Sequence, residues 1–226
     1  MQDYEGKMNG KGYRFLKVAG DLLVLNLEFI LCTALSLTIL FFPSLFALVS
    51  LCKKEKESYV NPFKDFFIEM KKFMKRGLIY EAIFLPIYAL CAYLLYLDYQ
   101  LIQQGETAFL AWLGLVILIG ILIAITSSLI ELPIFYAYFN EEKAWLGYQK
   151  AALITRKKVL LVITSWMIVL TFLFIFYMFY PLVFFFGIAL CCYILVSLSR
   201  SVYERLVIEE EKRKKEEQEE MSNYES

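Results

Sequence analysis

The sequence predicts an all-α fold: a polytopic integral membrane helical bundle with about five transmembrane helices and two basic amphipathic interfacial helices. Hydrophobic residues make up 60% of the 226 residues, against ~45–50% in an ordinary soluble domain. They form uninterrupted runs of roughly twenty residues or more, the length that an α-helix needs to cross a hydrocarbon core of ~30 Å. Lys and Arg gather in segments between these runs, as they do in the cytoplasmic loops of membrane proteins.

The first apolar run, over 22–51, contains a single charged residue, Glu28. It is too long for one straight crossing, and Pro43 disfavours an unbroken helix. The sequence therefore predicts a polar N-terminal segment over 1–20, a span over about 21–42 and a shorter helix from Pro43 onward. An alternative is a re-entrant hairpin broken at Pro43, which would return the N-terminus to the cytoplasmic side.

Four further spans follow from the remaining runs, at about 78–97, 108–130 extending to 139, 159–180, and 182–199. The run over 159–199 carries no charge. As one helix it would reach roughly 60 Å, so it must turn back, and Tyr180–Pro181 is the natural break. A transmembrane domain over 21–199 is then followed by a charged tail over 200–226, which continues the last helix into solvent.

Two segments interleave basic residues with large apolar side chains, at about 62–76 and 141–157. In the first of them, Phe63, Phe66 and Phe67 share one face at helical spacing, as in a helix that lies in the interface beside anionic lipid. The order of span, basic helix and span thus occurs twice, over 22–97 and 108–180. A weak internal repeat and a chance similarity of hydropathy both explain this order.

The charge distribution predicts a multi-pass protein of the cell membrane. Basic residues in 52–77, in 140–158 and in the tail fall on one side if five spans alternate, which makes the C-terminus cytoplasmic and the N-terminus extracellular. The N-terminal segment dissents from this rule, because it carries basic residues of its own: Lys7, Lys11, Arg14 and Lys17. The hairpin alternative would remove the conflict.

Composition argues against most kinds of chemistry. The chain has no histidine, and its five cysteines form no C-x-x-C pair, so they are predicted to be reduced packing residues. There is no glycine-rich phosphate loop and no paired-carboxylate motif. The sequence predicts no catalytic, cofactor or metal site, no enzyme and no nucleic-acid partner; the bilayer is the partner that it predicts.

Polar residues inside the apolar runs are the candidate site residues, because burying such groups in lipid is costly. They are Asn26, Glu28, Ser127, Ser128 and Glu131. We expect the two serine hydroxyls to hydrogen-bond Glu131. Two interpretations stay open: a polar pocket for a cation, proton or substrate, or polar contacts that fix helix packing, which for Asn26 means glue between helices.

The first run also resembles the YesL-like family, a bacterial membrane protein family of unknown function. The resemblance rests on Arg14-Phe15-Leu16 and on Asp21 to Leu27, which contains the Leu-Asn pair. It extends to single positions and short segments farther along: Thr38, Pro43, Ala47, Phe63 to Phe73 and Tyr96-Leu97-Asp98. Glu28 and Leu35 depart from the pattern. The similarity extends over roughly 13–205.

This resemblance implies a link to carbohydrate uptake, because the family is similar to proteins found alongside such systems in Gram-positive bacteria. It supplies no activity. We therefore expect an accessory or regulatory protein that binds another membrane protein, such as a sugar transporter. The alternative is a small secondary transporter that uses the intramembrane carboxylates Glu28 and Glu131.

Overall fold

The computed structural model describes residues 11–58, 60–104, 108–139 and 143–225, and the regular structure of these residues is entirely helical. In chain order the elements are α2 (Lys11–Leu35), α3 (Phe41–Glu57), α4 (Pro62–Gln104), α5 (Ala108–Tyr138), α6 (Ala144–Lys157), α7 (Val159–Met178), the π-helix η1 (Val183–Gly187) and α8 (Ile188–Glu225). Five stretches are long and apolar enough to cross a membrane: Gly12–Leu35, Pro62–Gln103, Trp112–Tyr138, Val159–Met178 and Val183–Arg213. The predicted fold class is confirmed.

The first apolar run breaks earlier than predicted. α2 ends at Leu35, and the chain turns over 36–40 before α3 begins at Phe41. Leu37 and Thr38 take positive φ angles of 51° and 72°, the left-handed conformation that often ends helices. The prediction of one span over 21–42 with a break at Pro43 is wrong, because Pro43 lies in the first turn of α3, where its missing N–H costs nothing.

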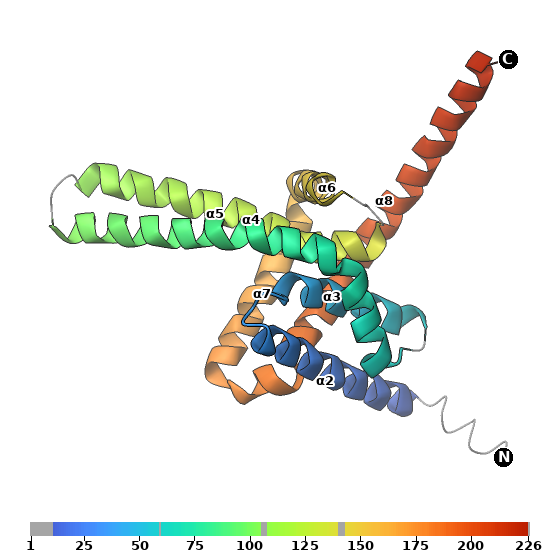
Figure 1. Cartoon of the computed structure of the whole chain (residues 1–226), viewed down its shortest axis with the longest axis horizontal. Helices are drawn as coiled ribbons and strands as arrows, with labels where there is room; N and C mark the ends of the chain where they lie inside the picture. The colour runs from blue at the N-terminus through green and yellow to red at the C-terminus, as the bar shows by residue number, and fades with distance from the viewer. Residues whose placement is uncertain (1–10, 59, 105–107, 140–142, 226) are drawn as a thin grey trace.

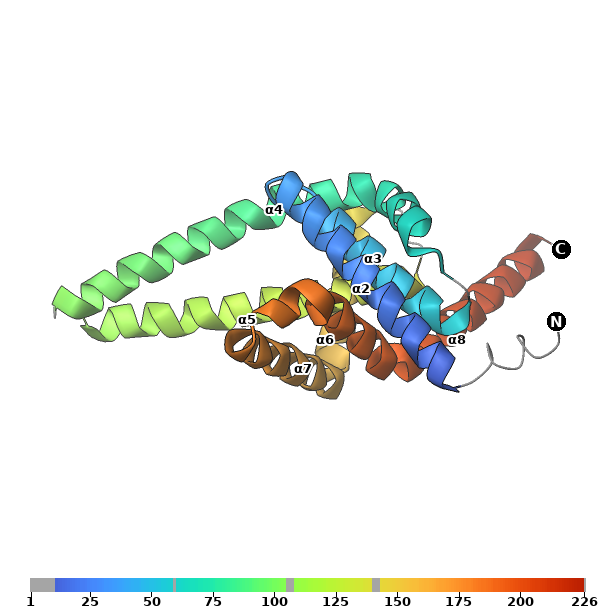
Figure 2. The same cartoon turned by 90° about the horizontal axis from the view of Figure 1, so that it is seen from below.

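α3 runs back along α2, so the two helices form a hairpin (Figure 2). The Lys17 ammonium on α2 lies 3.1 Å from a carboxylate oxygen of Glu55 near the end of α3. The predicted extracellular N-terminus rested on a single passage of the chain before the first basic loop. The path of α3 back along α2 has the shape of the hairpin alternative, with its break at 36–40 and not at Pro43, and α3 is not among the five stretches long enough to cross.

The core of the molecule surrounds α3. Phe46, Leu48 and Leu51 are at most 1% exposed, and α3 contacts α2, α4, α5 and α8. The ring of Phe46 meets the ring of Tyr80 on α4 edge to face, with centroids 5.7 Å apart. Over 42–52 every residue of α3 except Leu45 is buried, as expected of a helix that is apolar on all sides and lies at the centre of a bundle.

Gly77 allows α4 to approach the start of α3 closely. A Cβ atom at Gly77 would lie 2.5 Å from the ring of Pro43, which is well inside van der Waals contact. The predicted interfacial helix over 62–76 and the predicted span over 78–97 therefore join at Gly77 into one continuous helix. Figure 1 shows that α4 bends between the part beside α3 and the part that runs outward.

The outer parts of α4 and α5 form a long antiparallel hairpin that extends away from the other helices (Figure 1). We call residues 85–104 and 108–126 the arm. Its two helices are joined by a hydrogen bond of 2.7 Å between the hydroxyls of Tyr88 and Thr126. Nearer the tip, Gly114 makes room for the Asp98 carboxylate, which would lie 3.2 Å from an added Cβ atom.

The last helices follow the predicted pattern. α6 covers the second basic amphipathic segment from Ala144; residues 140–142 of the predicted 141–157 helix lie outside the described residues. α7 ends at Met178, and the chain turns before Pro181. α8 continues through the charged tail, which projects away from the bundle (Figure 1), and Glu210 in this tail lies 3.7 Å from Lys150 on α6.

Candidate functional site: buried polar groups in the helices

Asn26 on α2 joins two distant parts of the chain. Its side-chain amide N–H groups donate to the carbonyl oxygens of Val183 and Phe184, both at 2.8 Å. Its side-chain oxygen accepts from the backbone N–H groups of Ile188 and Ala189, both at 3.0 Å. Asn26 is fully buried, and this arrangement uses both donors and both acceptor positions of the amide.

These four bonds fall on the π-helix and on its junction with α8. Val183 and Phe184 begin the π-helical segment Val183–Gly187, and Ile188 and Ala189 follow it as the first residues of α8. A π-helical turn leaves backbone groups poorly paired in an apolar setting, and the amide of Asn26 satisfies them. The interpretation of Asn26 as glue between helices agrees with this geometry.

Glu131 on α5 is also fully buried, and its carboxylate accepts two hydrogen bonds. The hydroxyl of Ser165 on α7 donates to Oε1 at 2.8 Å. The hydroxyl of Tyr203 on α8 donates to Oε2 at 3.0 Å. One carboxyl group therefore links three helices, which is the packing interpretation of a polar group inside the bundle.

The two serines near Glu131 do not contact it as predicted. Ser127 donates to the carbonyl oxygen of Ile123 at 2.6 Å, and Ser128 donates to that of Ala124 at 3.1 Å. Helical serines one turn from a carbonyl bond back to it readily. Ser127 also accepts a hydrogen bond of 2.8 Å from the indole N–H of Trp166. The partners of Glu131 come instead from α7 and α8, which sequence proximity could not reveal.

Glu28 is the exception among the five candidates. Its side chain is 7% exposed, and neither carboxylate oxygen has a hydrogen-bond partner in the part of the chain that the structure describes. A buried carboxyl group without partners is costly, and it is often a functional group for that reason. Glu28 is thus the candidate whose carboxyl group a proton, a bound cation or a hydrogen-bonding partner would stabilise.

The fold keeps the two carboxylates apart. Glu28 lies on α2 and Glu131 on α5, and among the described residues these two helices make no contact with each other. The transporter alternative supposed a central polar site with Glu28 or Glu131, and the fold does not bring the two carboxylates into one site. Each must act alone if it acts at all.

An apolar cavity of about 490 Å³ lies among α3, α4, α5, α7 and α8. Of the polar side chains that line it, Tyr88 and Thr126 bond each other, so few donors or acceptors point inward. Sugars need many hydrogen bonds to replace those of water, so this cavity fits an apolar chain better than a polar solute.

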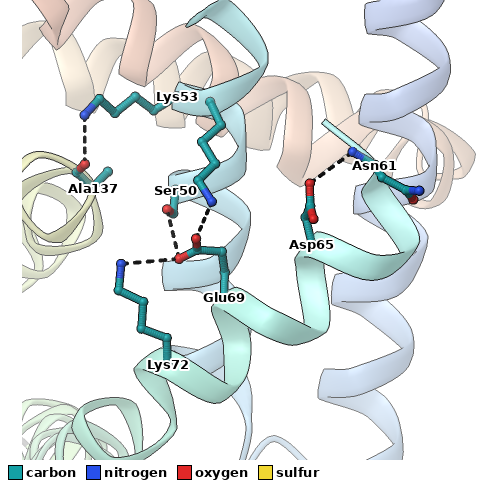
Figure 3. Close-up of polar contacts among 8 residues, drawn as sticks. Ser50, Lys53, Asn61, Asp65, Glu69, Lys72 and Ala137 are labelled. Atoms are coloured by element: carbon teal, nitrogen blue, oxygen red, sulfur yellow. Dashed lines mark hydrogen bonds and ion pairs between the residues drawn. The ribbon is translucent and has the colours of Figure 1, made fainter. Parts of the chain in front are cut away.

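A buried ionic cluster that the sequence did not predict lies between α3 and α4 (Figure 3). Glu69 is 5% exposed and accepts hydrogen bonds from Ser50, at 3.4 Å, and from the Lys54 ammonium. Lys72 lies 3.7 Å from the same carboxylate. Glu69 sits on the amphipathic segment whose apolar face was recognised, but its partners come from the returning helix α3, so only the hairpin reveals them.

Two further polar contacts join α3 to neighbouring helices. The Lys53 ammonium donates to the carbonyl oxygen of Ala137, at 3.1 Å, near the end of α5 (Figure 3). Glu55 binds Lys17 across the hairpin, and burial raises the pKa of Glu55 although this bond acts in the opposite direction. Several basic residues between the first two spans, Lys53 among them, therefore hold α3 against its neighbouring helices.

The described residues hold no group of three or more metal-ligating side chains, and all five cysteines are free. Comparison with known proteins adds a family. Residues 22–99 match the model of a family described as "Protein of unknown function, DUF624". YesL-like is the known name of this family, so the predicted resemblance is confirmed over these residues; over the rest of 13–205 it stays a prediction. No curated protein and no solved structure matched the chain.

Proposed function

We propose that this membrane protein, whose residues 22–99 match the model of the YesL-like family, is an accessory or regulatory subunit of a carbohydrate uptake system. In this proposal it binds a membrane-embedded transporter and moves no solute itself. The observation that carries the proposal is the arm. It is a long pair of apolar helices that the rest of the chain leaves uncovered (Figure 1).

The side chains of the arm support a docking role. Leu90, Val116 and Ile117 are between 55% and 62% exposed, although they are among the most apolar residues of the chain. The arm is held together internally by Tyr88, Thr126 and the contact of Asp98 with Gly114. It is therefore a formed surface, and a formed surface costs less entropy to bind than one that must first be ordered.

Co-purification tests this proposal. A tagged chain is expressed with a sugar permease at matched levels and extracted in mild detergent. We expect the permease to be recovered with the unaltered chain, and to be lost when Leu90, Val116 and Ile117 are replaced by Ala. The matched control replaces Ile163, Met167 and Leu170, exposed apolar residues of α7, and should retain the permease. Equal loss in both variants, or no recovery with the unaltered chain, contradicts the proposal.

Glu28 favours a second candidate, a small secondary transporter that couples uptake to a proton or cation. Its support is the buried carboxyl group without a partner among the described residues. Glu28→Gln should then abolish uptake into vesicles that contain the purified chain, whereas Glu57→Gln, at the exposed end of α3, should not. Unchanged uptake in Glu28→Gln removes this candidate.

We also propose that both termini lie on the cytoplasmic side of the cell membrane. The support is the hairpin of α2 and α3, which joins Lys17 to Glu55 and brings Arg14 and Lys17 beside Lys56 at the end of α3. Cysteine labelling in intact cells tests this orientation. A single cysteine added near the N-terminus should resist an impermeant maleimide, and one in the 36–40 turn should react.

A further inference from the structure

A groove of about 600 Å³ runs between the N-terminal part of α2 and the first part of α8. Its walls are apolar and come from Val18 and Leu22 on α2 and from Phe186 and Leu190 on either side of the η1–α8 junction. The two helices run in opposite directions, so one end of the groove lies at Arg14 and Tyr193 and the other points toward the middle of the bundle. Its shape and lining suit a single extended hydrocarbon chain.

The open end of the groove is cationic. Arg14 lines both the groove and an adjoining polar hollow of about 250 Å³, which Lys56 also lines. The Lys56 ammonium lies over the ring of Tyr193, 4.4 Å from its centroid, and Tyr193 is a wall of the groove. Two positive charges therefore stand where the apolar lining ends.

These two cations differ from their neighbours in their partners. Lys17 is paired with Asp21 and Glu55. Arg14 and Lys56 make no ion pair with any residue that the structure describes, although Glu57 also lines the hollow. Burial lowers the pKa of Lys56, which means that its charge is incompletely solvated, and a bound anion would stabilise it.

We propose that this groove binds one anionic phospholipid, with an acyl chain against Val18, Leu22, Phe186 and Leu190 and the phosphate between Arg14 and Lys56. The continuity of apolar wall and cationic mouth selects a lipid over a free anion, which would leave the groove unused. It also selects an anionic lipid over a zwitterionic one, because the hollow has three basic and two acidic side chains and Arg14 and Lys56 form no ion pair with the described residues. The site lies at the end of the bundle that carries the basic segments, where anionic headgroups would meet it.

Native mass spectrometry of the purified full chain tests the proposal. The protein is titrated with dioleoyl phosphatidylglycerol and, separately, with dioleoyl phosphatidylcholine, which has the same chains. We expect tighter binding of phosphatidylglycerol, and a loss of roughly thirtyfold in its affinity in the double variant Arg14→Gln, Lys56→Gln, since each of the two cations near a headgroup contributes about 1 kcal/mol. The charge-matched control Lys64→Gln, Lys75→Gln, on the exposed face of α4, should bind as the unaltered chain does.

A second pair of variants tests the groove itself. Ala19→Phe places a ring in the groove, which Ala19 lines, and should weaken phosphatidylglycerol binding without changing any charge; Ala92→Phe on the exposed face of the arm should not. Equal binding of the two lipids, or equal loss in the two charge variants, overturns the proposal. So does unchanged binding in Ala19→Phe, because attraction to the basic surface would then suffice.

Discussion

Helix α3 and the arm are both rich in apolar residues, yet the structure uses them in opposite ways. In α3, Leu48 and Leu51 are fully buried against neighbouring helices. In the arm, Leu90 is 58% exposed and Ile117 is 55% exposed, and the two helices contact mainly each other. The difference teaches that hydropathy identifies the segments that belong in lipid, whereas only tertiary packing tells which of them a partner could reach.

The largest effect should separate a leucine of α3 from one of the arm. Leu48→Ala should lower the free energy of unfolding by about 3 kcal/mol, because it leaves a cavity at a fully packed position. Leu90→Ala should change it by less than about 0.5 kcal/mol, as is usual for exposed positions. Chemical unfolding in detergent measures both. Similar values for the two variants would break the distinction between core and arm.

Asn26→Leu should cost nearly as much, about 2–3 kcal/mol, because it strands four backbone groups of η1 and the start of α8 in an apolar setting. We expect a lower melting temperature in detergent. Hydrogen exchange should also rise at Ile188 and Ala189, whose N–H groups lose their acceptor. Unchanged exchange at these two amides would show that the π-helix holds without Asn26.

Two glycine substitutions test the same difference between the core and the arm, with smaller expected changes in stability. Gly77→Ala should destabilise the protein by about 1–2 kcal/mol, because the new methyl group would collide with Pro43 and force the helices apart. Gly120→Ala in the arm, where nothing lies within 4 Å, should be neutral or slightly stabilising, since Ala favours helix. A shift in the same direction for both would contradict the packing described for Gly77.

The last prediction concerns the hydrogen bonds of Glu131. Glu131→Gln keeps an oxygen that accepts a hydrogen bond from Ser165 or Tyr203, so we expect a loss of about 1 kcal/mol. Glu131→Ala removes both acceptors and should cost at least twice as much. Thermal unfolding of the two variants provides the measurement. If Gln and Ala behave alike, the two hydrogen bonds add nothing to the link between α5, α7 and α8.

The sequence predicted the parts of this fold that depend on composition alone. The long apolar runs placed α5, α7 and the turn before Pro181, and the basic amphipathic patterns placed α6 and the first part of α4. The turn over 36–40 was missed, because Leu37 and Thr38 carry no turn signature and adopt positive φ only through their surroundings. Pro43 misled the prediction, since proline is as suitable for a first helical turn as for a break.

The candidate residues show the same division. Apolar context alone singled out Asn26, Glu28 and Glu131 as buried polar groups, and all three are buried. Their partners could not be predicted, because the bonds of Asn26 and Glu131 reach helices 34 to 163 residues away. Glu69 was overlooked for a related reason: on an amphipathic helix it reads as a solvent-facing charge until α3 folds back over it.

Photo-crosslinking in intact cells tests the central claim that the arm is a partner-binding surface. A photoreactive amino acid is placed at Ile117 in the arm or at Leu170 on α7, two positions of similar exposure, in cells that express a sugar permease. The account predicts a protein adduct that contains the permease from Ile117 and none from Leu170. Adducts with lipid alone at Ile117, or the same protein adduct from both positions, would contradict it.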